Sequence, residues 1–179
     1  MDSSQFEKDI TTLERLLAQS QGQFIEIGAE APCSFTQLKA YSDAELTAFE
    51  EAHSLRLPAA YRDFLLRIGA CEVFSFQGSH RAITFYPLDE IFALYADCFA
   101  QPEEWLFDKF LPIGIDNSLQ ESLVFGFGFS QPQQFFLLYH DYYLDELDDE
   151  NDPHFPAFFT AFERYLCQLI THRGRLSPH

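Results

Sequence analysis

Seven carboxylates gather in the acidic stretch Asp141–Asp152 of this 179-residue chain, with no Lys or Arg among them. Carboxylates can bind a hard cation such as Ca²⁺, contact a basic partner, or keep a loop solvated through mutual repulsion. Residues Asp145–Asp152 lack the central Gly and the ligand spacing of an EF-hand loop, so we predict no metal site. A solvated loop and a partner-contact surface both remain open. The carboxylates belong to Asp141, Asp145, Glu146, Asp148, Asp149, Glu150 and Asp152.

Histidines and cysteines are the other candidates for chemistry. His140 and His154 flank the acidic stretch, but nothing in the sequence fixes a geometry for metal binding or proton transfer. Cys71 and Cys98 have no nucleophile motif around them. We therefore predict no catalytic residue, no metal and no cofactor. The absence of a CxxC pair and of zinc-finger spacing predicts reduced, mostly buried thiols at Cys33, Cys71, Cys98 and Cys167.

Charge is unevenly distributed along the chain, whose formal net charge is -17. Residues 1–84 carry 12 acids and 7 bases, and residues 85–163 carry 16 acids and a single base, Lys109. Residues 164–179 carry 3 bases and no acid. Nucleic acid is a poor partner for such a surface, because phosphate binding depends on clustered Lys and Arg. A basic protein would be a good partner.

Four more residues complete the predicted partner-binding surface. Tyr142 and Tyr143 lie inside the acidic stretch, and aromatic side chains dominate interface hot spots. The alternative is that Tyr139–Tyr143 is a strand end packed on the last helix. Asp116 and Glu121 border the polar connection between two predicted strands and would add charge to the same face. The predicted surface is therefore built by loops of the sheet together with the acidic stretch.

The totals favour one folded domain. Hydrophobic residues make up 47% of the chain, with 21 Phe and 8 Tyr, which excludes a disordered chain. Apolar runs stay well short of the ~20 residues of a membrane span. The first residues lack a secretory signal, so we expect a cytosolic protein that does not bind membranes. We predict one domain over residues 1–172, with an N-terminal helix and extension at 1–41 and a flexible tail at 173–179.

The stretch Leu55–Gly69 predicts a short core helix with both ends marked. Pro58 suits the first helical position, and Gly69 suits a left-handed stop. The apolar residues at 61, 64, 65 and 68 fall on one side of a helix. Helical spacing also predicts helices at Ser3–Ala18, at Asp43–His53 behind a capping box of Ser42 and Glu45, and at His154–His172.

After Gly69 the pattern changes to that of strands. Two aromatic and β-branched runs separated by residues 77–80 predict an antiparallel hairpin. Together these elements predict an α+β fold: a single antiparallel sheet flanked by N-terminal helices and a C-terminal closing helix. The predicted strands are Val73–Phe76, Ala82–Tyr86, Leu111–Ile115, Ser122–Phe127 and Phe135–Tyr139, with a further short strand at Phe24–Ile27.

Short motifs occur in a particular order along these elements. Leu-Pro-x-x-Tyr-x-x-Phe-Leu stands at 57–65, Leu-Pro-Ile-Gly at 111–114, and Phe-x-x-Phe-x-x-Tyr-Leu at 159–166. Over residues 42–170 this arrangement resembles the SUKH superfamily, in its Smi/Knr cell-wall-regulator-like branch. Ile-Gly-Ala at 68–70 departs from the Asn-Gly-Gly that is usual there.

The resemblance implies a SUKH-like fold and protein binding without catalysis. For a bacterial member it implies an immunity protein, a cytosolic antidote that binds a cognate polymorphic toxin, commonly a nuclease. Fungal members are signalling scaffolds, so an intracellular regulatory scaffold without a toxin partner is the alternative. The charge pattern agrees independently, because an acidic face matches the basic cleft that a nuclease needs to attract phosphate. The oligomeric state stays open.

Overall fold

The structure is a computed structural model that describes residues 3–91, 93, 110–117, 123–128, 135–139 and 161–175. Helices flank an antiparallel sheet in these ranges, which confirms the predicted α+β class. Every helix in them falls short of the length and apolar character that a bilayer crossing requires.

The sheet has six strands in the described ranges, in the order β1-β2-β3-β4-β5-β6, so each strand pairs with its neighbours in sequence. The predicted hairpin is β2 with β3, and the three later predicted strands are β4, β5 and β6. The bounds are β1 Cys33–Lys39, β2 Ala70–Phe76, β3 Ile83–Phe85, β4 Phe110–Asp116, β5 Leu123–Gly128 and β6 Phe135–Tyr139.

The prediction for the first strand is wrong. Where a strand was expected at Phe24–Ile27, Ile25 forms only an isolated bridge with Cys33. The edge strand is β1 instead. Its apolar and polar residues alternate only over residues 33–36, and register shifts interrupt its pairing with β2, so the signal for a strand is short.

Two helices come from opposite ends of the chain: α1 spans Ser3–Ser20 and α5 spans Phe162–Thr171. The apolar face predicted for α1 is buried at Phe6, Ile10 and Leu13. The C-terminal helix is confirmed from residue 162 onward, and its predicted first turns, at 154–160, lie outside the described residues.

The other two helices are α2 (Asp43–Ala52) and α3 (Ala59–Arg67). The predicted capping box of α2 is present: Ser42 Oγ accepts the N–H of Glu45 at 3.3 Å, and the Glu45 carboxylate accepts the N–H of Ser42 at 2.8 Å. Pro58 stands just before α3 rather than at its first position. All four positions of the predicted α3 face are buried: Tyr61, Phe64, Leu65 and Ile68.

Gly69 ends α3 and lets it approach the chain at the end of β1. Its φ is 80°, in the left-handed region that favours glycine. A Cβ at this position would come within 2.1 Å of the carbonyl oxygen of Lys39. The predicted stop is therefore confirmed, and it is also a point of close backbone packing.

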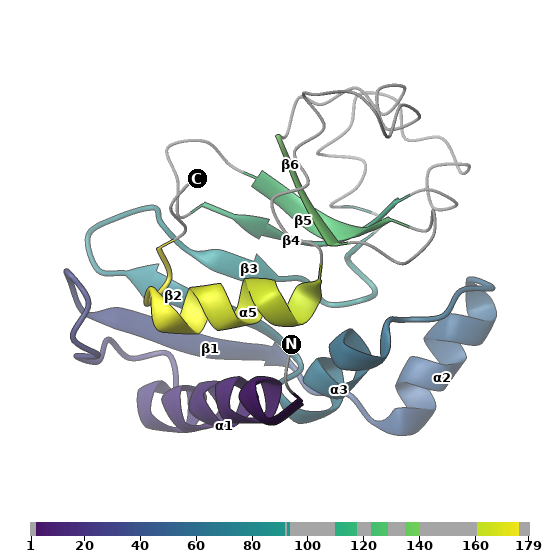
Figure 1. The fold of residues 1–179 in the computed structure, drawn as a ribbon, viewed down its shortest axis with the longest axis horizontal. Coiled ribbons are helices and arrows are strands. Elements are labelled where there is room, and N and C mark those ends of the chain that lie inside the picture. Colours follow the sequence, from purple (N-terminus) through teal and green to yellow (C-terminus); the bar gives the residue numbers. More distant parts are fainter. Residues whose placement is uncertain are drawn as a thin grey trace.

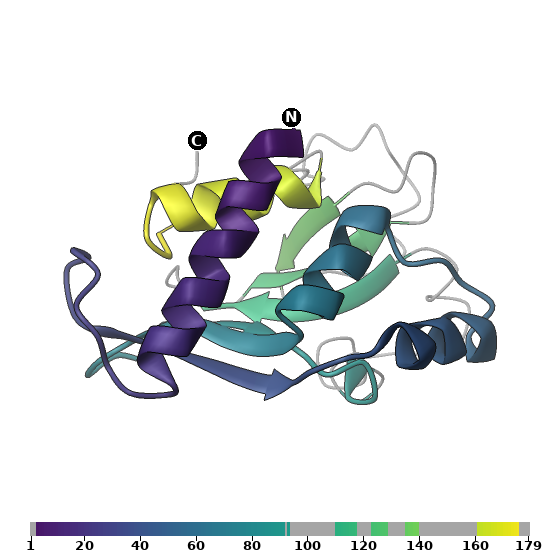
Figure 2. The ribbon, with the colours of Figure 1, turned by 90° about the horizontal axis from the view of Figure 1, so that it is seen from below.

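Three helices cover the same face of the sheet. Figure 2 shows α1, α3 and α5 on one side of the strands, and Figure 1 shows α5 crossing in front of them. α2 lies to the side, at the right-hand end of the molecule in both views. The core is therefore enclosed between the sheet and the three helices.

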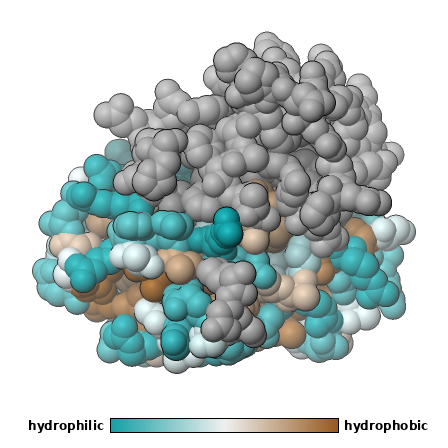
Figure 3. Space-filling view, in the orientation of Figure 1, coloured by the Kyte–Doolittle hydropathy of each residue, from teal (hydrophilic) through white to brown (hydrophobic). Residues whose placement is uncertain are grey.

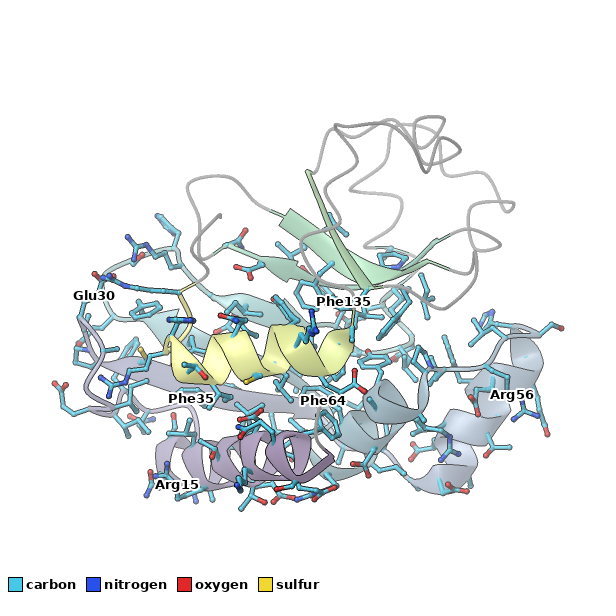
Figure 4. The ribbon with its side chains drawn as sticks, in the orientation of Figure 1. Arg15, Glu30, Phe35, Arg56, Phe64 and Phe135 are labelled. Carbon is cyan, nitrogen blue, oxygen red and sulfur yellow. The ribbon has the colours of Figure 1, made fainter. Side chains whose placement is uncertain are left out.

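Phe162, the first residue of α5, lies at the centre of an aromatic core. Its ring centroid is 5.4 Å from that of Phe64, 5.5 Å from Tyr61 and 5.7 Å from Phe135. Figure 4 shows Phe64 and Phe135 close to the beginning of α5. Aromatic pairs in such arrangements contribute about 0.5–1.5 kcal/mol each beyond their buried area. Its other ring contacts are with Phe6, Phe85 and Phe127.

Candidate partner-binding surface

Asp116 belongs to the predicted partner-binding surface, but the structure places it in the core. It is the last residue of β4 and is 0% exposed. Its Oδ2 accepts a hydrogen bond of 2.9 Å from the hydroxyl of Tyr165 on α5. A carboxylate enclosed in this way cannot touch a partner, so the prediction for Asp116 is wrong. The sequence missed Tyr165 as its partner.

Tyr165 and Asp116 together dock α5 on the sheet. Burial, followed by the charge of Asp116 and the hydrogen bond to it, raises the pKa of Tyr165 well above its ordinary value of 10.0. The hydroxyl therefore keeps its proton and remains a donor to the carboxylate. This bond fixes the helix that follows the acidic stretch.

The other ten residues of the predicted surface lie outside the described ranges. The structure does describe the elements that precede and follow the acidic stretch, β6 and α5. β6 ends at Tyr139 and pairs with β5 from Phe135 onward, and α5 begins at Phe162 in the aromatic core. The ten residues are Glu121, Asp141, Tyr142, Tyr143, Asp145, Glu146, Asp148, Asp149, Glu150 and Asp152.

Arg67 joins α3 to α1. Its Nε and Nη2 donate to the carboxylate of Glu14 at 3.0 and 2.9 Å, and its Nη1 donates to Glu7 at 2.7 Å. The hydrogen bonds that Arg67 donates to Glu14 and then to Glu7 raise its pKa above the ordinary value, against the opposing effect of burial. Its charge is thus neutralised by carboxylates of the fold itself.

Glu50 joins α2 to α3 in a similar way. It is 5% exposed, and its Oε1 accepts the backbone N–H of Leu57 at 2.8 Å. Its Oε2 accepts from Nε of Arg62 at 3.4 Å, while Nη1 of Arg62 donates to Asp43 at 2.7 Å. Here too a cation and its carboxylates hold two elements together.

Three arginines meet around the loop that precedes β1. Arg81 and Arg175 both pair with the carboxylate of Glu30, and Arg173 donates to the carbonyl oxygen of Gly28. Figure 4 labels Glu30 in this group, at the left of the molecule. We call these five residues the arginine clasp.

The flexibility of the tail at 173–179 stays a prediction, while Arg173 and Arg175 from this segment make contacts in the arginine clasp. One signal in the sequence pointed to these contacts. Residues 164–179 carry bases without any acid, so their charges must find carboxylates in another part of the chain or outside it.

The described surface is mainly hydrophilic on the face that Figure 3 shows, with hydrophobic residues in separate spots. The large hydrophobic side chains exposed in the described ranges are Phe24 at 49%, Leu38 at 47% and Leu66 at 37%. Isolated residues of this kind are normal on a protein surface. Charge is therefore the more distinctive property of this surface.

Cys33, Cys71 and Cys167 are free thiols, and the first two are buried, as predicted. Burial raises the pKa of Cys33 to about 11 and raises that of Cys71 further still. Protonated thiols are weak nucleophiles. No three His, Cys, Asp or Glu residues in the described ranges lie close enough together to hold a metal ion. Cys98, His140 and His154 lie outside those ranges.

Comparison with known families places these elements in a wider context. Residues 40–160 match the model of the SMI1 / KNR4 family (SUKH-1), which is more than half of the chain and includes α2, α3 and strands β2 to β6. The chain belongs to the SMI1/KNR4 family. The SUKH resemblance predicted from the motifs is thereby confirmed. In this member, α1, β1 and α5 lie outside the matched residues, yet β1 pairs with β2 and α5 supplies the centre of the core.

The chain is also similar to the immunity protein RhsIB of Dickeya dadantii, with 40% identity over 55 residues. The similar stretch covers 31% of this chain and 32% of that protein. The match therefore spans about a third of the length of the relative.

Proposed function

We propose that this member of the SMI1/KNR4 family is an immunity protein, which binds a cognate toxin polypeptide and holds it inactive without catalysing a reaction. The similarity to RhsIB carries the proposal, because that relative is named as an immunity protein. The family match over residues 40–160 supports it, since it extends well beyond the 55 residues of that similarity.

The charge distribution supports a basic toxin of the nuclease type. Residues 85–163 carry 16 acids and one base. Four of the seven bases in residues 1–84 pair with acids of the same region, and a fifth, Lys39, pairs with Asp89 of the acidic region. A nuclease presents a basic cleft to bind phosphate. An acidic surface would speed its encounter with such a cleft and would compete with the nucleic acid there.

The experiment is a binding and inhibition assay with the toxin domain encoded beside this gene. The purified chain should bind that domain and suppress its cleavage of nucleic acid, and the affinity should fall as salt rises. Absence of a neighbouring toxin gene together with absence of any basic binding partner would contradict the proposal. Binding that is insensitive to salt would instead support the regulatory scaffold.

A triple variant tests whether the acidic stretch makes the contact. Asp145→Asn, Asp148→Asn and Asp149→Asn together should weaken toxin binding and reduce its dependence on salt. The matched control removes three charges elsewhere, at acids that form no ion pair within the described ranges. It consists of Glu26→Gln, Glu51→Gln and Asp63→Asn. Equal losses in both variants would mean that net charge, rather than this stretch, drives the encounter.

A further inference from the structure

The arginine clasp gathers three cations around one carboxylate on a chain of net charge -17. Its arginines come from the β2–β3 turn and from the segment after α5, and its carboxylate comes from the loop before β1. We propose that the arginine clasp is a second docking site, which takes a carboxylate-rich peptide segment of a partner protein.

The clasp retains donors for such a segment. The side chains of Arg81 and Arg175 are 43% and 54% exposed, and Arg173 is exposed. A guanidinium has five N–H donors, and the contacts within the clasp engage one nitrogen of each arginine. Arg173 binds a carbonyl oxygen, and no carboxylate of the described ranges pairs with it. Among the described residues, its guanidinium therefore keeps a positive charge that an incoming anion can contact.

Glu30 indicates which anion fits. Its carboxylate lies between Arg81 and Arg175 and bonds to both, so the two guanidinium groups are already spaced to share a carboxylate. The planar fork of arginine suits this group better than the point charge of lysine does. The Glu30 carboxylate thus represents, within the chain itself, the type of group that we propose the clasp binds on a partner protein.

A short acidic peptide fits the chain better than nucleic acid does. Screening in physiological salt limits the reach of the acidic remainder of the molecule to about 8 Å. A peptide of a few residues that contacts only the clasp interacts with fewer of the chain's other charges than a long polyanion does. The residues of the clasp differ from those of the acidic stretch, and the proposal does not depend on a toxin.

The test measures binding of a fluorescein-labelled octaglutamate peptide to the full chain by fluorescence anisotropy, at low and at physiological salt. The double variant Arg173→Gln, Arg175→Gln should weaken binding roughly five- to thirtyfold at low salt. Replacing the same two residues by Lys should restore part of the affinity. The matched control, Lys8→Gln with Arg15→Gln, removes two cations from α1 and should leave the affinity unchanged.

The Glu30→Gln variant distinguishes a docking site from a set of contacts that only stabilises the fold. Without the internal carboxylate, Arg81 and Arg175 become free to bind the peptide, so its affinity should rise even though the loop loses two ion pairs. A fall in affinity would overturn the proposal. So would equal losses in the double variant and its control, or tighter binding of a DNA oligonucleotide of the same charge. Self-association that the double variant abolishes would overturn it too, because the occupant would then be another copy of this chain.

Discussion

Residues 1–84 and residues 85–163 use charge in opposite ways. In the first region 12 acids accompany 7 bases, and the ion pairs of Arg62 and Arg67 join α3 to α2 and to α1. In the second region 16 acids accompany Lys109 alone. Asp116, the one acid of the second region's predicted surface that the structure describes, is buried and accepts a hydrogen bond from Tyr165.

This difference separates charges that stabilise the fold from charges that could bind a partner. Charges that are paired inside the fold contribute to stability, so their removal should lower the free energy of unfolding. Charges in excess repel one another, so their removal should leave stability unchanged or raise it slightly while it weakens binding to a basic partner. Four predictions follow from this division. The first concerns the aromatic core and provides the reference for a large loss of stability.

Phe162→Ala should have the largest effect on stability. The substitution removes the ring that six other aromatic residues surround and should cost about 3–5 kcal/mol of the free energy of unfolding. Urea denaturation followed by tryptophan fluorescence measures it. Phe24→Ala, which removes a ring that is 49% exposed, is the control and should change stability little. Similar costs for the two variants would contradict the position of Phe162 in the core.

Glu50→Ala should have the next largest effect. It leaves the N–H of Leu57 without its acceptor and removes one of the two carboxylates that Arg62 contacts, at a cost of about 2–3 kcal/mol. The neighbouring exposed acid provides the control, since Glu51→Ala should stay within about 0.5 kcal/mol of the parent. If the two variants unfold at the same urea concentration, Glu50 does not hold α2 to α3.

Asp9→Asn should change the dependence of stability on pH. Asp9 is buried on α1, and burial raises its pKa from the ordinary value of 3.8, against opposing hydrogen bonds from Gln5 and Cys167. The folded chain therefore holds this proton more tightly than the unfolded chain does. Asp9 accordingly costs stability as the pH rises from about 3.8 through the raised pKa.

The Asn variant does not titrate at this position. Its urea midpoint should exceed that of the parent at pH 7, and the difference should shrink as the pH falls towards the ordinary carboxyl pKa. Glu51→Gln, at an exposed position, is the control. A difference that stays constant between pH 7 and pH 4 would show that the proton on Asp9 is not linked to folding.

The triple substitution of Asp145, Asp148 and Asp149 by Asn should have the smallest effect on unfolding, within about 0.5 kcal/mol of the parent. It should nevertheless weaken toxin binding, as proposed above. A large loss of stability would break the division between the two regions, because the acids of the stretch would then take part in the framework. Urea denaturation and the binding assay on the same samples decide between these outcomes.

Local signals predicted local structure well. The capping box of Ser42 and Glu45, the buried face of α3 and the stop at Gly69 depend on residues a few positions apart, and the structure contains all of them. The strand β1 escaped prediction because its alternation of apolar and polar residues extends only over residues 33–36 before the register shifts.

Contacts between distant residues could not be predicted from periodicity. Asp116 resembled a surface charge at a strand end, and its burial depends on Tyr165, which lies 49 residues further along the chain. Arg173 resembled part of a frayed tail, and its contact with Gly28 joins residues 145 positions apart. Both contacts depend on where α5 and the residues that follow it lie relative to the rest of the chain, which is a property of the whole fold.

The central position of Phe162 also sets an order of events during synthesis. The rings of α1, α3, β3, β5 and β6 that contact it emerge first, and they cannot complete their packing until α5 has been made. Translation at ~5–20 residues per second places Phe162 roughly one to five seconds after the end of β6. Until then the nascent sheet has an uncovered aromatic face. Docking of the last helix is therefore the closing step of folding. A ribosome that pauses before residue 162 would leave an intermediate with exposed aromatic side chains, which is prone to aggregation.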